Sequence, residues 1–349
     1  SDPDHGTRQG STVLKSLEQN SFSSPIEEIE HTLVHPAQGP EMASALLTWP
    51  IYTALLTCSL TSTIAWDYTA AIPGLKASQL VFDDVPGFTR SVQRDTYSLV
   101  APESQVWQPH PRWPGALTAH LISPAVKANF AMFFAKLGLN STGTSPATGV
   151  ERFIFVLGGE LTLDVVGENA PVQLTYNDYA YLPPGQEHSL STSSEASLLV
   201  FERRYAGQGS PDFVHGHTED SPLLPVPGEV FRLRKLVPQT PAYDFNIHIM
   251  DFSPGEHLNV KEMHYNQHGL LLLAGKGIYR LNEDWHAVQA GDVIWMAPYV
   301  PQWYAALGTQ PTRYLIYKDT TLDPLETPWL GQGAAASACG CAARSCNAA

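Results

Sequence analysis

Three side chains of metal-binding types lie within seven positions of one another in the stretch KEMHYNQHG, residues 261–269: Glu262, His264 and His268. On an α-helix the second and third would point about 200° and 240° away from the first, so the three would not share a face. On one straight strand they would share a face, but at about 3.3 Å per residue the outer two would lie roughly 20 Å apart. One metal ion can therefore bind all three only if the chain turns between His264 and His268, and Asn266 favours such a turn.

Gln302, in the stretch MAPYVPQWYAALG, is a fourth candidate ligand, because a small β-barrel can gather ligands from several strands. Two imidazole nitrogens with a carboxylate and a neutral amide form a fairly hard set. Such a set suits six-coordinate Mn²⁺, with Fe²⁺ second, better than a tetrahedral structural zinc. Four protein ligands leave two positions for water or a chelating substrate, so the ion could act as a Lewis acid. The alternative to a metal site is that these histidines are ordinary hydrogen-bonded residues on the surface of a β-sheet.

The composition restricts the partners of the chain. Its 349 residues carry a formal net charge of −14, which argues against nucleic acid or an anionic membrane surface as a partner. A hydrophobic content of 43% can fill the cores of two ordinary domains. We therefore expect a protein without a stable membrane span that acts on a small-molecule substrate.

Short apolar or alternating runs separated by Gly, Pro, Asn and Asp predict an all-β fold with few short helices. Examples are FIFVLGGELTLDVV at 153–166, GIYRLNEDW at 277–285 and DVIWMAPYVP at 292–301. Runs of this length, rich in branched and aromatic residues, are typical of strands. Their regular spacing favours an antiparallel sandwich or barrel.

The β pattern occurs twice. The stretches NFAMFFAKLG and FIFVLGG resemble NIHIMDFSPG and LLLLAGK, which follow 117 residues later. NDYAYLPPGQEH likewise resembles GDVIWMAPYVPQ at an offset of 114 residues. We expect two similar β domains at 75–205 and 226–325, joined by a Pro/Gly-rich linker at 206–225.

The first repeat keeps only two of the four candidate ligands. In this alignment Glu151 and His188 take two of the places, while Ser145 and Ala147 stand in the other two. Two ligands rarely retain a metal ion, so the first site is predicted to be degenerate. Glu151 and His188 are then vestigial polar residues or contacts between the domains, and a second metal site is the alternative.

Both ends of the chain differ from the repeats. Residues 1–65 form a predicted extension in which 42–65 resembles a secretory signal, and the alternative is a buried N-terminal segment. The apolar run in it is too short for a transmembrane helix. The Ala/Gly-rich tail, 326–349, is predicted to be disordered. Its three cysteines fit no zinc pattern, and Asn140 could be glycosylated only if the chain were secreted.

The stretch YLPPGQEH, 181–188, resembles the second motif of the cupins, in which a histidine follows PxG. The first cupin motif places two histidines two residues apart, then an acid and a glycine. In the second repeat the ligand types are exchanged: Glu262 stands for the first histidine, His268 for the acid and Gln302 for the last histidine. The resemblance implies a bicupin, with two tandem antiparallel β-barrel (jelly-roll) domains.

The exchanged ligands, together with the stretches around them and RYLIYKD, resemble one cupin branch, the (S)-ureidoglycine aminohydrolases. This resemblance implies Mn²⁺-dependent hydrolysis of (S)-ureidoglycine to (S)-ureidoglycolate and ammonia in purine ureide (allantoin) breakdown. It also implies a homo-oligomer and, as in plant members, location in the endoplasmic reticulum; a cytoplasmic location is the alternative.

By the same resemblance, Tyr279, Tyr314 and Lys318 contact the substrate, with Lys318 the partner of its carboxylate and with Tyr279 and Lys318 catalytic. Both residues could also have no role in the reaction. A tyrosine in GIYRL could simply pack in the barrel wall, and a lysine at a strand end could be a solvated surface residue. Two other functions compete. A bicupin dioxygenase is disfavoured because the amide of Gln302 is an odd ligand for redox iron. A storage-type bicupin without metal is disfavoured because the four-ligand set is intact.

Overall fold

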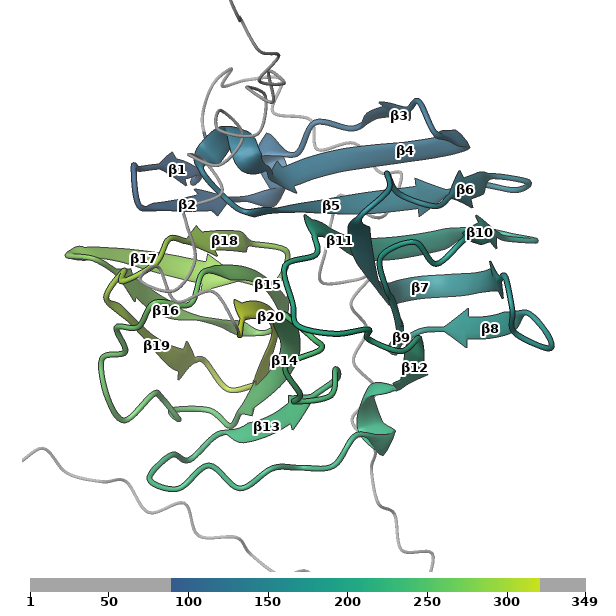
Figure 1. The fold of residues 1–349 in the computed structure, drawn as a ribbon. Coiled ribbons are helices and arrows are strands. Elements are labelled where there is room, and N and C mark those ends of the chain that lie inside the picture. Colours follow the sequence, from purple (N-terminus) through teal and green to yellow (C-terminus); the bar gives the residue numbers. More distant parts are fainter. Residues whose placement is uncertain (1–88, 321–349) are drawn as a thin grey trace, which may run out of the picture. The chain divides into compact units, whose positions relative to one another are not determined.

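Twenty strands and three short 3₁₀ helices make up residues 89–320, the part of the chain that the computed structural model describes (Figure 1). The all-β prediction with few short helices is confirmed. The 3₁₀ helices are η2 (Pro102–Ser104), η3 (Pro124–Val126) and η4 (Thr218–Asp220). Within 89–320 no helix has the length and apolarity needed to cross a membrane. The predicted extension 1–65, its signal segment 42–65 and the tail 326–349 lie outside the described residues.

Most strands of the first half form one ten-stranded antiparallel unit that is closed by its longest strand. In spatial order the strands are β12 (Val214–His217), β9 (Asp178–Leu182), β7 (Val150–Val165), β11 (Ala196–Arg204), β5 (Phe130–Leu137), β4 (Trp113–Ile122) and β3 (Gln108–His110), with β6 (Thr142–Thr144), β8 (Val172–Thr175) and β10 (His188–Ser191) beside them. The first part of β7 pairs with β9 and β11, and its last part pairs with β8 and β10. One strand thus belongs to both walls of the barrel.

The second half has a seven-stranded and a three-stranded sheet. The larger contains β1 (Val92–Gln93), β2 (Tyr97–Val100), β18 (Val293–Met296), β15 (His268–Ala274), β20 (Thr312–Asp319), β14 (Phe245–Phe252) and β13 (Arg232–Lys235), and the smaller contains β17 (Asp284–Gln289), β16 (Lys276–Leu281) and β19 (Gln302–Leu307). Gly275 lies between β15 and β16, where the chain passes from one sheet to the other. Its φ is +79°, and a Cβ there would lie 2.7 Å from the carbonyl oxygen of Pro311, so glycine is required.

Two strands that precede the first barrel join the larger sheet of the second half. β2 pairs with β18 of the second half, although residues 92–100 precede the first barrel in the sequence. Figure 1 shows β1 and β2, in blue, beside the green strands of the second half. Residues 206–225, expected to be a linker, contribute β12, which pairs with β9 of the first half. The sheets therefore do not follow the predicted boundaries 75–205 and 226–325.

Three buried apolar clusters follow from the alternation of side chains along the strands. One fills the first barrel, with Ile154, Val156 and Leu198 among its members. Another fills the second barrel and includes Leu270 and Leu272. The third consists of the opposite faces of strands from both halves and lies between the barrels. Each central strand is thus buried on both sides, which explains the continuous apolar runs in the sequence.

The internal repeat is offset by 116 residues on these central strands, one fewer than the sequence alignment indicated. Leu157 is the bulged residue of β7 against β11, and Leu273 is its counterpart in β15 against β20. The glycines that follow the bulges, Gly159 and Gly275, have φ of +78° and +79°. Because successive strand residues face opposite sides, a shift of one residue changes which side chains enter the barrel.

A buried cation joins the two halves. Arg203 of β11 donates from Nη1 to the hydroxyl of Tyr317 and to Oδ1 of Asp319 in β20, each at 2.8 Å. Its Nη2 lies 3.6 Å from Oδ2 of Asp244, and its Nε lies 3.8 Å from Oε1 of Glu151. Since the guanidinium is fully buried, its charge is stable only because Asp244 and Asp319 lie beside it. We call these five residues the interface cluster.

One carboxyl of the interface cluster should make stability depend on pH. Burial, aided by the neighbouring Asp244, raises the pKa of Glu151 from 4.5 to about 10, although Arg203 acts in the opposite direction. Between these values the folded chain holds a proton that the unfolded chain has lost, so stability falls as pH rises through this window. Glu151→Gln should therefore gain free energy of unfolding over the unsubstituted protein from about pH 5 to about pH 9, measured by urea unfolding. A difference that stays constant over this range would contradict the assignment.

Candidate metal centre and active site

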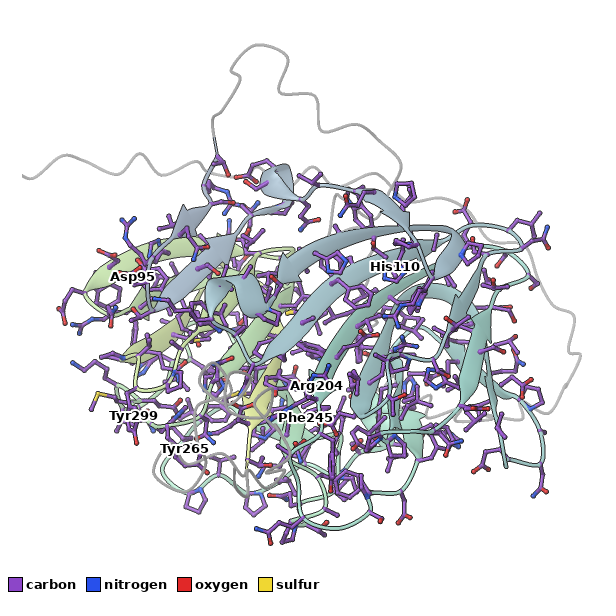
Figure 2. The ribbon with its side chains drawn as sticks, turned by 45° about the horizontal axis from the view of Figure 1, so that its top comes forward. Asp95, His110, Arg204, Phe245, Tyr265 and Tyr299 are labelled. Carbon is purple, nitrogen blue, oxygen red and sulfur yellow. The ribbon has the colours of Figure 1, made fainter. Side chains whose placement is uncertain are left out.

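The four predicted ligands come from two facing sheets. Backbone hydrogen bonds of 2.9 Å in both directions join Glu262 to Gln302 at the start of β19. The chain then bends at Tyr265, and His268 opens β15 in the opposite sheet. A hydrogen bond of 2.8 Å from Tyr299 N to the carbonyl of His264 holds the intervening loop. Figure 2 shows Tyr265 and Tyr299 at the same end of the second half. The turn that the spacing required is therefore present.

The other three side chains converge on Nε2 of His264. That atom lies 3.4 Å from Nε2 of His268 and 3.2 Å from the amide nitrogen of Gln302. It also lies 3.7 Å from Oε2 of Glu262. Neighbouring ligands of one six-coordinate cation, bound at about 2.1 Å, would be separated by roughly 3 Å. The separations are thus close to those that a shared ion requires.

The donor set fits an ion only when the amide is included. Among the described residues, no three His, Cys, Asp or Glu side chains form a metal-binding group by themselves. Gln302 directs its nitrogen towards His264 and accepts a 3.4 Å hydrogen bond at Oε1 from the hydroxyl of Tyr279. A half-turn of the amide would direct its oxygen into the cluster instead. The residues present can then supply two nitrogens and two oxygens.

The protonation states of the cluster suit a cation. Nδ1 of His268 donates to the carbonyl of Tyr317 over 3.1 Å, which leaves the lone pair of Nε2 free to bind. Burial holds the pKa of His268 well below 6.5, so this imidazole is neutral. The hydrogen bond with His264 lowers the pKa of Glu262, and Lys318 acts in the same direction. The site thus offers the carboxylate of Glu262 and the neutral imidazole of His268.

Lys318 lies in the floor of the site. On the inner face of the sheet it stands between His268 of β15 and Asn246 of β14, each its direct neighbour across the ladder. Its side chain is half-buried, and burial lowers its pKa while Glu262 opposes that shift. A partly desolvated ammonium in this position suits an anionic group of a bound molecule.

Tyr317 and Asp319, the residues before and after Lys318, belong to the interface cluster. The first half therefore helps to hold Lys318 in place. Nδ2 of Asn129, in the first half, donates to Oδ2 of Asp319 over 3.0 Å, and the backbone N–H of Asn129 donates to Oε1 of Gln267 over 2.9 Å. The amide of Asn266 in turn donates to the carbonyl of Asp319. These bonds fix both the turn before His268 and the strand end that carries Lys318.

The two predicted tyrosines take different places. Tyr279 is fully buried and reaches the cluster through Gln302. Tyr314 lies farther along the barrel, opposite Leu272, with its ring 5.4 Å from that of Tyr304. Burial is the largest cause that raises the pKa of both hydroxyls well above 10, and the charge of Glu262 adds to it. Both remain protonated and can donate hydrogen bonds.

The corresponding site of the first half contains a guanidinium. At the offset of 116 residues the counterpart of His268 is Arg152, and that of Lys318 is Glu202. Nη1 of Arg152 donates to Nε2 of His188 over 2.7 Å, and Nη2 donates to Glu202 over 2.6 Å. Burial lowers the pKa of His188 to about 4, and Arg152 adds to that effect, so the imidazole is a neutral acceptor. The permanent positive charge of Arg152 thus stands where the second barrel has a candidate metal ligand.

The alignment with Glu151 as the counterpart of His268 is therefore off by one residue. Glu151 lies on the opposite face of β7, where it accepts a 2.6 Å hydrogen bond from Tyr181 and joins the interface cluster. The sequence reasoning missed Arg152 for the same reason. Both repeats carry the same bulge, at Leu157 and Leu273, so the error comes from the adjacent glycines Gly158 and Gly159, of which only the second is the counterpart of Gly275.

These geometries predict one metal ion per chain. Because the first site already holds Arg152, His188→Ala should leave about one equivalent of Mn²⁺ bound, measured by elemental analysis after dialysis. His264→Ala removes the nitrogen nearest the other three ligands and should lower the content below about 0.1 equivalent. Two equivalents in the unsubstituted protein would contradict the assignment of the first barrel.

Comparisons with known proteins identify the domain and the relatives of the chain. The family model for the cupin domain matches residues 248–317, which include His264, His268 and Gln302. The (S)-ureidoglycine aminohydrolase of Arabidopsis thaliana is 54% identical over 267 residues, 76% of this chain and 88% of the relative. The probable (S)-ureidoglycine aminohydrolase of rice (Oryza sativa subsp. japonica) is 54% identical over 74% of this chain and 83% of the relative.

A solved structure supports the fold. The putative glyoxylate-induced protein from Pseudomonas aeruginosa superimposes with a TM-score of 0.62 at 25% identity, over 68% of this chain and 93% of that protein. The extent of the sequence identity to the plant relatives, which spans both barrels, is what assigns the family. The chain belongs to the (S)-ureidoglycine aminohydrolase family of bicupins.

Proposed function

We propose that this chain is an Mn²⁺-dependent hydrolase that converts (S)-ureidoglycine to (S)-ureidoglycolate and ammonia. The observation that carries the proposal is the convergence of Glu262, His268 and Gln302 on His264, with Lys318 beside them on the same inner face. Membership of the family supports the reaction, and the hard donor set supports manganese.

The substrate matches the site group by group. Its reacting carbon carries an amine, a carboxylate and a ureido group. Bound by the four ligands, the ion would supply Lewis acidity towards this chelating molecule. Lys318 binds the carboxylate as a charge-assisted partner. Tyr279, whose hydroxyl stays protonated, positions a hydrogen-bond donor next to Gln302. One water enters and one ammonia leaves, so the reaction is a hydrolysis.

The competing functions fit less well. A dioxygenase would require a redox ion tuned by strong ligands, whereas one ligand here is a neutral amide. A storage bicupin would not require ionised Glu262, half-buried Lys318 and the hydroxyl of Tyr279 beside the candidate ligands. Location in the endoplasmic reticulum and homo-oligomeric assembly are parts of the same proposal that rest on the sequence and on the family resemblance.

Ammonia release tests the proposal. The manganese-loaded protein should release ammonia from (S)-ureidoglycine well above the uncatalysed background, measured by coupled assay. Lys318→Ala should lower kcat/KM by about 100-fold, mostly through KM, because the carboxylate loses its charged partner. Lys276→Ala, at an exposed position on β16, is the matched control and should change it less than twofold. Absence of ammonia from the unsubstituted protein would exclude the proposed reaction.

A further inference from the structure

A second histidine lies on the inner face of the active barrel. His248, on β14, shares a face with Met250 and Phe252, whose side chains belong to the core of the second barrel. It stands opposite Ile316 of β20 and Lys235 of β13. Lys318 is therefore its diagonal neighbour on the same face, at about 7–8 Å between Cα atoms. His248 lies one row deeper in the barrel than Lys318.

The imidazole of His248 is available to a ligand. Its side chain is half-buried, and neither ring nitrogen makes a hydrogen bond with any of the described residues. The histidines that act as structural residues here differ in this respect: Nδ1 of His188, for example, donates to the carbonyl of Gln186 over 2.8 Å. Burial is the main cause that lowers the pKa of His248 well below 6.5, so the ring has one donor and one acceptor nitrogen.

The first half shows that the fold does not need a histidine at this position. Its counterpart, Phe133 of β5, occupies the same place opposite β11 and packs in the apolar core. Two other inner residues of the second barrel that carry a polar group change in the same way. Tyr279 and Tyr314 correspond to Leu163 and Leu198. His248 thus varies together with residues of the active site, while the architecture stays constant.

The position of His248 matches one end of the substrate. Lys318 takes the carboxylate, and the candidate ligand His268 lies on the far side of Lys318 from β14. The ureido group is the remaining polar part of the molecule, with N–H donors and a carbonyl acceptor. The acceptor nitrogen of a neutral imidazole can take a hydrogen bond from the terminal amino group of the ureido group.

We propose that His248 recognises the ureido group of the substrate and so determines specificity for urea-type compounds. This inference rests on the proposed function. The place proposed for the ureido group is the inner face of β14, where His248 stands between Lys235 on β13 and the row of Lys318 on β20.

Two probes isolate this contact. N-carbamoylglycine carries the ureido group, whereas N-acetylglycine keeps the carboxylate and replaces the terminal amino group by methyl. The substitution His248→Phe introduces the residue that the first barrel tolerates at this place. Titration calorimetry on the metal-loaded protein should show about a tenfold loss of affinity for N-carbamoylglycine and less than a twofold loss for N-acetylglycine. The KM for ureidoglycine should rise by about as much.

Matched variants separate recognition from folding. His248→Gln keeps a donor and an acceptor and should restore most of the affinity for N-carbamoylglycine. His215→Asn, at an exposed position on β12, should leave both affinities unchanged. If the unsubstituted protein releases ammonia, equal losses of affinity for both probes, or no loss for either, would contradict the proposed role of His248. If that protein releases no ammonia, the proposed reaction fails instead, and the two calorimetric affinities still decide whether the imidazole reads a ureido group.

Discussion

The buried guanidinium of Arg203 is the interaction on which the arrangement of the two halves depends. It belongs to β11 of the first half, but its closest partners, Tyr317 and Asp319, belong to β20 of the second. A buried charge is tolerated only when its partners stay in place, so the cluster fixes the two barrels relative to each other. Lys318 lies between these two partners. The first half is therefore a structural part of the site in the second.

Each barrel has a carboxylate facing its interior, and the two barrels balance this negative charge in different ways. In the second barrel Glu262 supplies a negative charge that a bound cation would balance. In the first, Glu202 is balanced by Arg152, which stands at the place of a metal ligand and hydrogen-bonds His188. A covalently attached cation is permanent and needs no open coordination position. The first barrel can therefore remain stable without an ion, at the expense of reactivity.

Much of this site could be predicted from the sequence, because ligand types and strand periods are local properties. The misfit of Glu262, His264 and His268 to a single helix or strand required the turn that the structure contains. The side on which Glu151 lies could not be predicted, since the sequence does not show which of the adjacent glycines Gly158 and Gly159 has the positive φ of Gly275, and that choice sets the alignment to within one residue. The exchange of β2 into the second half was equally hidden, because the pairing of a strand is decided by distant partners.

The charge distribution also bears on how an anionic substrate reaches this site. A net charge of −14 disfavours the approach of a carboxylate, but at ionic strengths near 0.1 M charges farther than about 10 Å are largely screened. The charges close to the site then determine whether the carboxylate is attracted. Lys235 and Lys318 flank His248 on the inner face, and burial lowers the pKa of both lysines, so neither ammonium is fully solvated there. A substrate carboxylate that enters the barrel places a negative charge near both ammonium groups. The barrel thus attracts at short range the kind of molecule that the protein as a whole repels.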